Sequence, residues 1–367
     1  MIASLGARFV QDSQIQEAVH ASHSLLKDHR GAGGAIPNNV DCVTLRPNFR
    51  AYADGGLWWI VTRTLLTPER ASEHTPDIPD DGPDVDVVRE VLHWYQYQDV
   101  DQSGLLSMQE GSDWQDLFCT RGKGLYLNCL YVLALRRAAE FFEGDEGEHL
   151  RQRAASVADR INAYFWYRGD RDTRRHLSNT FSTEGTALQD SMGRTRELPE
   201  KQYLIDERYY LPYLGFRSLG EWFDSFGNLL AILAGVADRQ QSDIILDFIA
   251  RHSLDIWPLR SLTPVVRPGD PDWRNYYGSL NAPHHYHNGG VWPFLGGFYV
   301  AALVKAGRRE AAALALHRLA ELNQHGQFNE WHHGETGIPM GAQDQAWSAG
   351  MYLFAWECVS RGQVALL

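Results

Sequence analysis

Apolar residues recur at the three- and four-residue spacing of amphipathic helices through about ten stretches of this sequence. Hardly any segment shows the strict alternation of apolar and polar residues that marks a half-buried strand. This pattern limits the fold more than any other feature, because it predicts an essentially all-α chain. The predicted helices span residues 15–26, 56–66, 85–97, 124–142, 149–167, 219–237, 242–250, 290–305, 309–324 and 345–361.

The connections between the predicted helices alternate between short and long. Connections as long as these in a compact domain usually carry function, so we expect the site where they converge. An even succession of helices with this alternation fits a toroid of paired helices whose long loops gather at one end. The long connections, rich in Gly, Pro, Asp, His and Trp, are 38–55, 99–123, 263–289 and 326–342.

We expect a single domain over residues 1–367, because no segment has the length and composition of a linker. Residues 170–202 are rich in Arg, Thr, Ser and Glu, and we interpret them as an insertion or a lid. No internal repeat is apparent at the period of roughly 20 to 50 residues that marks solenoids, which disfavours that architecture.

Charge and cysteine content disfavour several partners. The formal net charge of −12 argues against nucleic acid and against an anionic membrane surface. The first residues lack a basic region followed by an apolar core, and no apolar run approaches the roughly 18 residues of a membrane span. The four cysteines form no CxxC pair, as expected of reduced thiols in a cytoplasmic protein. The sequence leaves open a monomer or a homo-oligomer.

Tryptophan placement favours a carbohydrate cleft. Several of the twelve Trp residues stand beside Asp, Gly or His rather than inside apolar runs, which suits stacking on sugar rings. In Arg50-Ala-Tyr-Ala-Asp-Gly-Gly-Leu-Trp-Trp59, the carboxylate of Asp54 is placed to accept hydrogen bonds from pyranose hydroxyls, with Trp58 or Trp59 as a stacking platform. Helix capping by Asp54 and core packing by the tryptophans are the alternatives.

The segment Glu110-Gly-Ser-Asp-Trp-Gln-Asp116 combines acids with a Trp and a glycine. A general acid that works near neutral pH needs a carboxyl whose pKa is raised by an apolar wall or by a second carboxylate, and both are present here. Asp113 and Asp116 are the candidates, and capping of a helix start is the alternative for both.

Glu330 stands between an Asn and a Trp in the segment Gln327-Phe-Asn-Glu-Trp-His-His-Gly-Glu335, where a base that holds a water is expected. Glu335 competes for this role, and a solvated loop carboxylate is the alternative for either. A third segment, His284-His-Tyr-His-Asn-Gly-Gly-Val-Trp-Pro293, gathers imidazoles and aromatic rings before a helix. Because its spacing differs from that of a zinc helix, hydrogen bonds to sugar hydroxyls are favoured over metal binding.

One further segment fits the twelve-residue calcium loop, with a Gly at its sixth position. The flanking helix pair is not evident, so a tight Asp- and Gly-rich turn is the alternative to bound calcium. The residues that match are Asp99, Asp101, Ser103, Gly104 and Glu110.

Taken in order, these blocks resemble the catalytic domain of bacterial glycogen-debranching (amylo-α-1,6-glucosidase) enzymes. The relatives of those enzymes are the neutral/alkaline invertases and the processing α-glucosidases, including mannosylglycerate and glucosylglycerate hydrolases. The resemblance covers nearly the whole chain. It consists of the blocks Asp54-Gly-Gly-Leu-Trp-Trp-Ile, Trp114-Gln-Asp116 with Thr120-Arg-Gly-Lys and Leu127-Asn128, Tyr286-His-Asn-Gly-Gly-Val-Trp-Pro293, and Phe328-Asn-Glu330 with Gln345-Ala-Trp-Ser348.

The resemblance implies an (α/α)6 toroid of the six-hairpin glycosidase type and hydrolysis with inversion. It selects Asp116 over Asp113 as general acid and Glu330 over Glu335 as general base, with their carboxyl groups about 6.5–9.5 Å apart. No organic cofactor is required. The expected substrate-binding residues are Asp54, Trp58, Trp59, Asp113, Trp114, Arg121, His287, Trp292, Gln345 and Trp347.

The expected substrate is a small α-linked glucoside or mannoside: a disaccharide, a sucrose-like sugar or a glyceric-acid glycoside. The last would need a cation for its carboxylate, for which Arg50, Arg121 and Arg217 are candidates. The chain departs from the family at Tyr126, where the acid block has Glu, and it lacks the N-terminal β-rich domain of many debranching enzymes, which disfavours a branched glucan. Two rivals remain: a sugar epimerase or isomerase that uses paired histidines, and a noncatalytic carbohydrate-binding protein.

Overall fold

The computed structural model describes residues 1–49, 53–66, 84–167, 187–189, 195–197, 207–215, 218–364 and 366. Most of the predicted insertion at 170–202 lies outside these residues, as do Arg50 and Arg217. The two described pieces of the insertion, β5 (Ala187–Gln189) and β6 (Thr195–Glu197), pair as an antiparallel hairpin.

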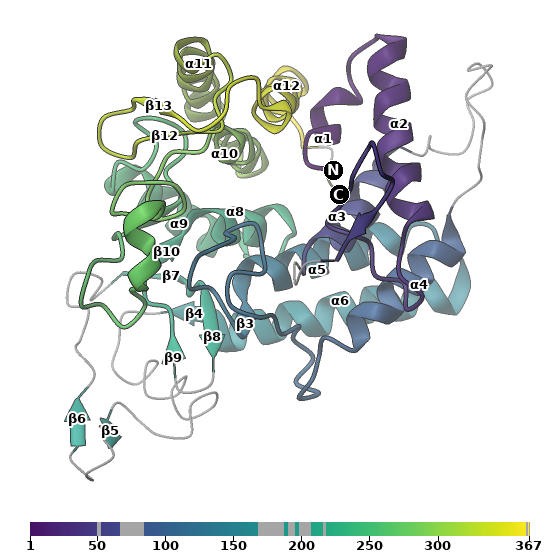
Figure 1. Cartoon of the computed structure of the whole chain (residues 1–367), viewed down its shortest axis with the longest axis horizontal. Coiled ribbons are helices and arrows are strands. Elements are labelled where there is room, and N and C mark those ends of the chain that lie inside the picture. Colours follow the sequence, from purple (N-terminus) through teal and green to yellow (C-terminus); the bar gives the residue numbers. More distant parts are fainter. Residues whose placement is uncertain are drawn as a thin grey trace.

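The described helices alternate along the chain between an inner and an outer ring (Figure 1). Two inner helices are buried all round: every residue of α8 is buried, as is every residue of α10 before its last. Outer helices bury one stripe, as α6 does with apolar residues every three or four positions. The inner helices are α1 (Ser4–Ala7), α3 (Gly55–Leu66), α5 (Leu125–Ala138), α8 (Ser225–Leu233), α10 (Pro293–Lys305) and α12 (Ala346–Arg361), and the outer ones are α2 (Ser13–Asp28), α4 (Val85–Gln96), α6 (Gly144–Phe165), α9 (Arg239–Arg251) and α11 (Arg309–Gly326).

The inner ring is closed by contact between its first and last helices. Each inner helix packs against the next one along the chain, and α1 lies between α12 and α3 (Figure 1). The close approach uses glycine, because a Cβ built on Gly6 would lie 1.7 Å from the carbonyl oxygen of Gly350. The helices therefore form a toroid, as the sequence predicted, although the short helix α1 was not among the predicted elements.

Short strands pair in the connections between the helices. They are β1 (Asn39–Val40) with β2 (Pro47–Asn48), β3 (Lys123–Gly124) with β8 (Tyr213–Gly215), β8 with β9 (Ser218–Leu219), β4 (Trp166–Tyr167) with β7 (Tyr209–Tyr210), β10 (Phe223–Asp224) with β11 (Leu262–Thr263), and β12 (Trp331–His332) with β13 (Pro339–Met340). All these pairs are antiparallel. The pairs β1–β2, β8–β9 and β12–β13 are hairpins within one connection, whereas β3–β8, β4–β7 and β10–β11 tie different connections together.

This pairing corrects three predicted helix boundaries. The predicted helix 219–237 begins only at Ser225, because residues 218–224 are used in β9 and β10. The predicted start at residue 290 moves to Pro293, since Val291 bridges to His332. The helix predicted from residue 149 already begins at Gly144 and ends at Phe165, where strand β4 follows.

The structure bears on two expectations from the sequence, the state of the cysteines and the presence of membrane-spanning helices. All four cysteines are free thiols, three of them buried and Cys42 exposed. Among the described helices, none combines the length and the apolar character needed to cross a membrane.

Candidate active site

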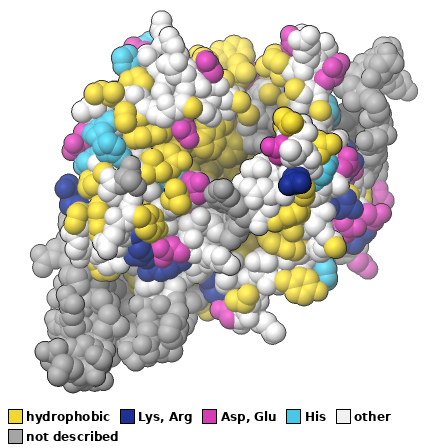
Figure 2. All heavy atoms as spheres, viewed as in Figure 1, with side chains coloured by type: hydrophobic (Ala, Val, Ile, Leu, Met, Phe, Trp, Pro, Cys, Tyr) yellow, Lys and Arg dark blue, Asp and Glu magenta, His cyan; other side chains and the backbone are white. Residues whose placement is uncertain are grey.

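Three loops build the candidate site at one end of the helical ring. The aspartate loop (residues 107–122) precedes α5, the histidine loop (281–292) precedes α10, and the glutamate loop (327–345) precedes α12. The face viewed in Figure 2 is hollowed near its centre, with hydrophobic side chains inside the hollow, acidic side chains around it and a group of histidines to one side.

Asp116 of the aspartate loop meets His287 of the histidine loop. The imidazole Nε2 lies 3.1 Å from Asp116 Oδ1, and the Asp116 side chain is 34% exposed whereas that of His287 is only 1% exposed. Burial lowers the pKa of His287, and the nearby Asp116 carboxylate opposes this effect. A buried neutral imidazole therefore holds one face of a partly exposed carboxylate, and His287 Nδ1 has no hydrogen-bond partner among the described residues.

Aromatic rings enclose this pair. Trp292 is stacked on the His287 ring with centroids 4.9 Å apart and planes at 3°, and Trp114 meets both rings edge-on at 5.1 and 5.7 Å. Trp347 approaches Trp292 at 5.6 Å and stacks on Phe294. The indole N–H groups of Trp114 and Trp347 have no hydrogen-bond partner among the described residues. Four predicted site residues thus lie together with Asp116.

Asp54 is held at the start of α3 by a chain of buried hydrogen bonds. The hydroxyl of Tyr126 in α5 donates to Asp54 Oδ2 at 2.7 Å, and it accepts a hydrogen bond of 2.7 Å from Trp58 Nε1. Burial raises the pKa of Asp54, the bond from Tyr126 lowers it, and the charge of Asp116 raises it further. The electrostatic interaction between Asp54 and Asp116 connects this group to the aspartate loop.

Two more carboxylates lie buried behind Asp116. Asp113 is 1% exposed and accepts the backbone N–H of Gln115 at 2.8 Å. Burial raises its pKa well above the usual value, and the charges of Asp54, Asp224 and Asp116 add to this effect. Asp224, the N-cap of α8, has its pKa raised by burial to about 7, despite the hydrogen bond that it accepts from Gly227 N. Asp113 has too little exposed surface to contact a substrate directly, so it acts through its charge on the neighbouring carboxylates.

Glu330 lies in the glutamate loop, directly before β12. Its backbone N–H donates to Ala342 O at 2.8 Å, and its Oε2 accepts the N–H of Ala342 at 3.3 Å. A Cβ on Gly341 would lie 2.5 Å from this Oε2, and the backbone φ of Gly341 is +71°. A glycine is therefore needed beside the carboxylate. Glu335, the competing acid, is 61% exposed and faces His284, with 3.2 Å between Oε1 and Nε2.

Backbone hydrogen bonds join the glutamate loop to the histidine loop. Val291 and His332 exchange N–H···O bonds of 2.8 and 2.7 Å, and Gly334 N donates to His284 O at 2.8 Å. The rings of Trp331 and Tyr286 meet at 5.8 Å. Because His287 contacts Asp116, the histidine loop is in contact with both the aspartate loop and the glutamate loop.

Backbone strain is concentrated in the same loops. Non-glycine residues with positive φ are uncommon, particularly when they are bulky, and they tend to mark functional sites. Nine occur among the described residues. Six of them lie in the three loops: Leu117, His284, Tyr286, Gln327, Phe328 and Asp344.

The remaining predicted contacts have structural partners. Trp59 is fully buried, with its indole N–H bonded to His23 O of α2 at 3.1 Å, which explains it as a packing residue. Gln345 is the N-cap residue of α12 and its N–H donates to Phe328 O at 2.9 Å. A sugar contact by either residue remains a prediction.

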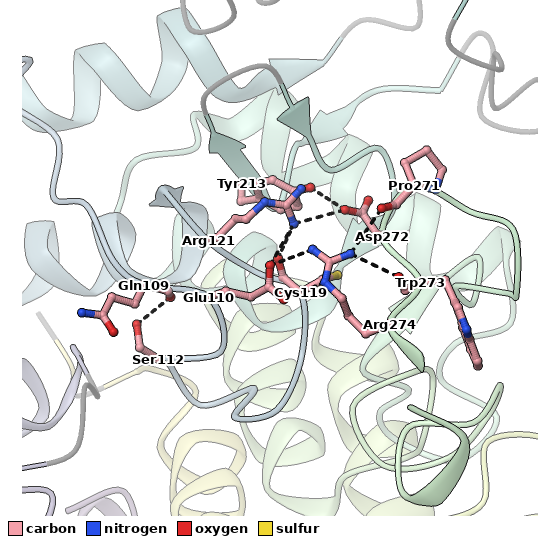
Figure 3. A network of polar contacts seen from close by, with 10 residues as sticks. All are labelled: Gln109, Glu110, Ser112, Cys119, Arg121, Tyr213, Pro271, Asp272, Trp273 and Arg274. Atoms are coloured by element: carbon pink, nitrogen blue, oxygen red, sulfur yellow. Dashed lines mark hydrogen bonds and ion pairs between the residues drawn. The ribbon is translucent and has the colours of Figure 1, made fainter. Parts of the chain in front are cut away.

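Arg121 belongs to a network between the aspartate loop and residues 271–274 (Figure 3). Its guanidinium stacks on Tyr213 at 4.6 Å, bonds Asp272 Oδ1 at 3.3 Å and approaches Glu110 at 3.6 Å. Arg274 binds both oxygens of Glu110 at 2.7 Å. Arg121 is therefore engaged by two carboxylates and a ring.

The predicted calcium loop holds its own hydrogen bonds. Asp99 Oδ2 accepts Gly104 N at 2.8 Å, Ser103 Oγ donates to Asp99 Oδ1 at 3.4 Å, and Asp101 Oδ1 accepts Lys123 Nζ at 2.8 Å. Glu110 is bound by Arg274, as described above. Among the described residues, no group of three or more His, Cys, Asp or Glu side chains is arranged to hold a metal ion. Calcium binding remains an untested prediction.

Sequence reasoning missed three residues of the site. Asp224 stands in an apolar run, and Tyr126 was noted only as a departure from the family. Asn281, which is buried, bonds Leu117 O through Nδ2 at 2.9 Å and His287 N through Oδ1 at 3.1 Å. A carboxylate or amide next to a buried helix start is the signal that could have found Asp224, but nothing local marks Asn281.

The fold is shared with solved glycosidases. The structure of GH63 mannosylglycerate hydrolase from Thermus thermophilus in complex with glucose matches with a TM-score of 0.64, at 13% identity over 97% of this chain and 91% of that one. A bacterial glucoamylase complexed with acarbose matches with a TM-score of 0.60, at 13% identity over 100% of this chain and 49% of that one. The predicted (α/α)6 barrel is confirmed.

Sequence relatives are plant invertases. Neutral/alkaline invertase 1, mitochondrial, of Oryza sativa subsp. japonica is 26% identical over 332 residues, which cover 83% of this chain and 50% of that protein. Probable alkaline/neutral invertase D of Arabidopsis thaliana is 27% identical over 335 residues, covering 83% and 59%. The chain thus spans about half the length of the first of these relatives. The family described as alkaline and neutral invertase matches residues 50–361. The chain therefore belongs to the alkaline and neutral invertase family of glycoside hydrolases.

Proposed function

We propose that this chain is an inverting glycoside hydrolase that cleaves a small α-linked glucoside, with Asp116 as general acid and Glu330 as general base. The observation that carries the proposal is the partly exposed Asp116 carboxylate, held by buried His287 inside an aromatic enclosure. Family membership supports the reaction class.

His287 prepares Asp116 for proton transfer. Burial keeps the imidazole neutral, so it carries one N–H, and the tautomer that suits a carboxylate acceptor has its proton on Nε2. That N–H donates to Asp116 Oδ1 and fixes the plane of the carboxyl group. In the protonated acid the carboxyl proton lies on the other oxygen, Oδ2, and it passes to the glycosidic oxygen as the bond to the anomeric carbon breaks, which leaves Asp116 as a carboxylate.

Glu330 takes a proton from the attacking water. The bond from Ala342 N orients Oε2, and Oε1 accepts no hydrogen bond from the described residues. Water attacks the face of the oxocarbenium-like carbon opposite the leaving group, so the configuration inverts, provided that the carboxyl groups stand about 6.5–9.5 Å apart. Only acid–base groups act, so the proposed chemistry needs no organic cofactor.

The proposed substrate is sucrose or a related neutral α-glucoside. The relatives are named invertases, and a fold neighbour was solved with glucose. Among the predicted cations, Arg121 already faces Asp272 and Glu110, which disfavours it as the partner of an anionic aglycone. For the glucosyl ring, Asp54 supplies an acceptor, and Trp114 and Trp347 supply indole N–H groups that have no partner among the described residues. The N–H groups of Trp58 and Trp292 are already donated to Tyr126 and to the carbonyl oxygen of Tyr286.

A proton NMR time course tests this proposal. Purified protein is mixed with sucrose, maltose, isomaltose, glucosylglycerate and mannosylglycerate, and β-glucose is expected first from an α-glucoside. Asp116→Asn and Glu330→Gln should each lower the rate at least about 100-fold. Glu335→Gln, a neighbouring loop carboxylate, serves as the control and should retain activity.

The rival functions give different readouts. If no glycoside is cleaved, free sugars in deuterated water are followed for exchange at carbon. Exchange would indicate an epimerase or isomerase that uses the histidine cluster, and sugar binding without turnover or exchange would indicate a binding protein.

A further inference from the structure

Tyr126 links two residues that the proposed function assigns to the sugar. Its hydroxyl lies 2.7 Å from Trp58 Nε1 and 2.7 Å from Asp54 Oδ2, and the side chain is 1% exposed. An indole N–H can only donate, and an ionised carboxylate can only accept. Trp58 therefore donates to the Tyr126 hydroxyl, and that hydroxyl in turn donates to Asp54.

The Tyr126 bond acts on a carboxylate that has two other carboxylates near it. Asp54 faces Asp113 and Asp116 of the aspartate loop, Tyr95 of α4 and the amino group of Met1, besides Tyr126 itself. A glutamate in place of Tyr126 would add another carboxylate to this cluster. A tyrosine instead contributes a neutral donor, so Asp54 gains a hydrogen bond without gaining a repulsive neighbour.

The turn that carries Asp54 and the Asp54 side chain are held by different tyrosines. The hydroxyl of Tyr95 donates to Ala53 O at 2.7 Å and accepts Leu57 N at 3.2 Å, which holds the turn into α3. Tyr126 then fixes the carboxylate itself. Without the Tyr126 hydroxyl, the fold of this turn would persist, but the carboxylate would lose the side-chain donor on Oδ2 and its rotation would be freer.

We infer that Tyr126 is a positioning residue that acts through Asp54 and thereby sets the affinity of the site for the glucosyl ring. This inference rests on the proposed function, because it takes Asp54 as the acceptor for sugar hydroxyls. Tyr126 touches neither acid nor base in the mechanism. Its effect should therefore fall on KM more than on kcat.

The test is a double-mutant cycle of Tyr126→Phe and Asp54→Asn, measured as kcat and KM for the glycoside that the wild type cleaves. Tyr131→Phe is the matched control, because Tyr131 is a buried tyrosine of the same helix and donates to no carboxylate among the described residues. Urea unfolding of each variant separates positioning from stability.

Tyr126→Phe should raise KM about 10-fold, change kcat less than about threefold and unfold within the range of Tyr131→Phe. In the Asp54→Asn background it should add almost nothing, because Tyr126 acts on KM only through the Asp54 carboxylate, which that background lacks. Equal kinetics of Tyr126→Phe and Tyr131→Phe, or fully additive losses in the double variant, would overturn the inference.

A further measurement distinguishes failure of this inference from failure of the proposed function. If the wild type cleaves no glycoside, the same cycle is measured as glucose affinity by calorimetry. A loss of glucose affinity in Tyr126→Phe that is absent in the Asp54→Asn background supports the inference without hydrolysis. A wild type that neither cleaves glycosides nor binds glucose overturns both.

Discussion

The buried carboxylate of Asp224 makes the stability of the folded protein depend on pH. One oxygen accepts the N–H of Gly227 at 3.0 Å, and the other has no hydrogen-bond partner among the described residues. Burial raises the pKa of Asp224 to about 7, so the folded protein holds a proton that the unfolded chain releases near pH 4. The unfolding free energy therefore falls as pH rises between these two values.

Asp224→Asn should remove this pH dependence. The carboxamide oxygen can still cap α8, but it carries no charge to bury. Between pH 5 and pH 8 the wild type should lose about 3 kcal/mol more unfolding free energy than the variant, and above pH 8 the difference between the two should stay constant. Urea unfolding at both pH values measures the difference. Parallel changes in wild type and variant would contradict the assigned pKa.

Gly341→Ala tests whether the position of the Glu330 carboxylate depends on the absence of a side chain at residue 341. The new Cβ would lie 2.5 Å from Glu330 Oε2, and the positive φ adds strain of roughly 1–2 kcal/mol. Hydrolysis should fall at least about 10-fold. Gly269→Ala is the control, because its φ is +96° but nothing lies within 4 Å of the added Cβ. It should lose stability alone, and equal loss of activity in both variants would refute the steric argument.

At the scale of elements, the ion-pair network of Figure 3 connects the aspartate loop to the chain that leads to the histidine loop. Glu110 and Arg274 form a two-bond pair, and Asp272 joins Arg121 with Tyr213, whose hydroxyl donates at 2.6 Å. These contacts add little stability, because their arginines are partly exposed. Their effect lies in fixing the loop that carries Asp116.

Arg274→Gln should therefore impair catalysis more than folding. We expect kcat/KM to fall about fivefold, because small displacements of a catalytic group are costly, and the unfolding free energy to change by about 1 kcal/mol or less. Arg308→Gln is matched: Arg308 is 27% exposed and pairs with Asp243 and Asp247 between outer helices. It should lose similar stability with no change in kcat/KM, and an equal kinetic loss would count against the positioning role.

The helices were largely predictable because their periodicity depends on local sequence. Residues 85–97 and 309–324, for example, fall within two residues of α4 and α11. The boundary at Ser225 was missed because pairing between β10 and β11 is a long-range contact that no local pattern encodes. Helix α1 was missed because four residues are too few to show a helical periodicity.

Within the site, the acids and His287 were predicted from residue type and resemblance, whereas Asn281 and the supporting role of Tyr126 were not. Tyr126 and Asn281 act through partners 72 and 164 residues away in sequence, at Asp54 and Leu117. A carboxylate in a Gly- and Trp-rich loop is a local signal. The donor that orients it is supplied by the fold, and only the folded chain shows which residue that is.

At the scale of the whole molecule, the ring depends on contact between its first and last inner helices. Helix α12 follows the glutamate loop, and α3 follows Asp54, so closure through α1 brings the two halves of the site into a fixed relation. Because adjacent inner helices pack against one another all the way round the ring, one loosened junction should relax the whole toroid.

Gly350→Ala should open this junction. A Cβ on Gly350 would lie 2.5 Å from Ala3 O, a backbone atom that cannot move without displacing α1. We expect a loss of about 2 kcal/mol or more in unfolding free energy, as for an overpacked core, and a fall of several degrees in Tm. Gly278→Ala, with nothing within 4 Å of the added Cβ, should leave Tm nearly unchanged. Because Gln345 and the glutamate loop lead directly into α12, kcat/KM should fall with Tm in Gly350→Ala, and full activity at a wild-type Tm would show that the ring does not depend on this contact.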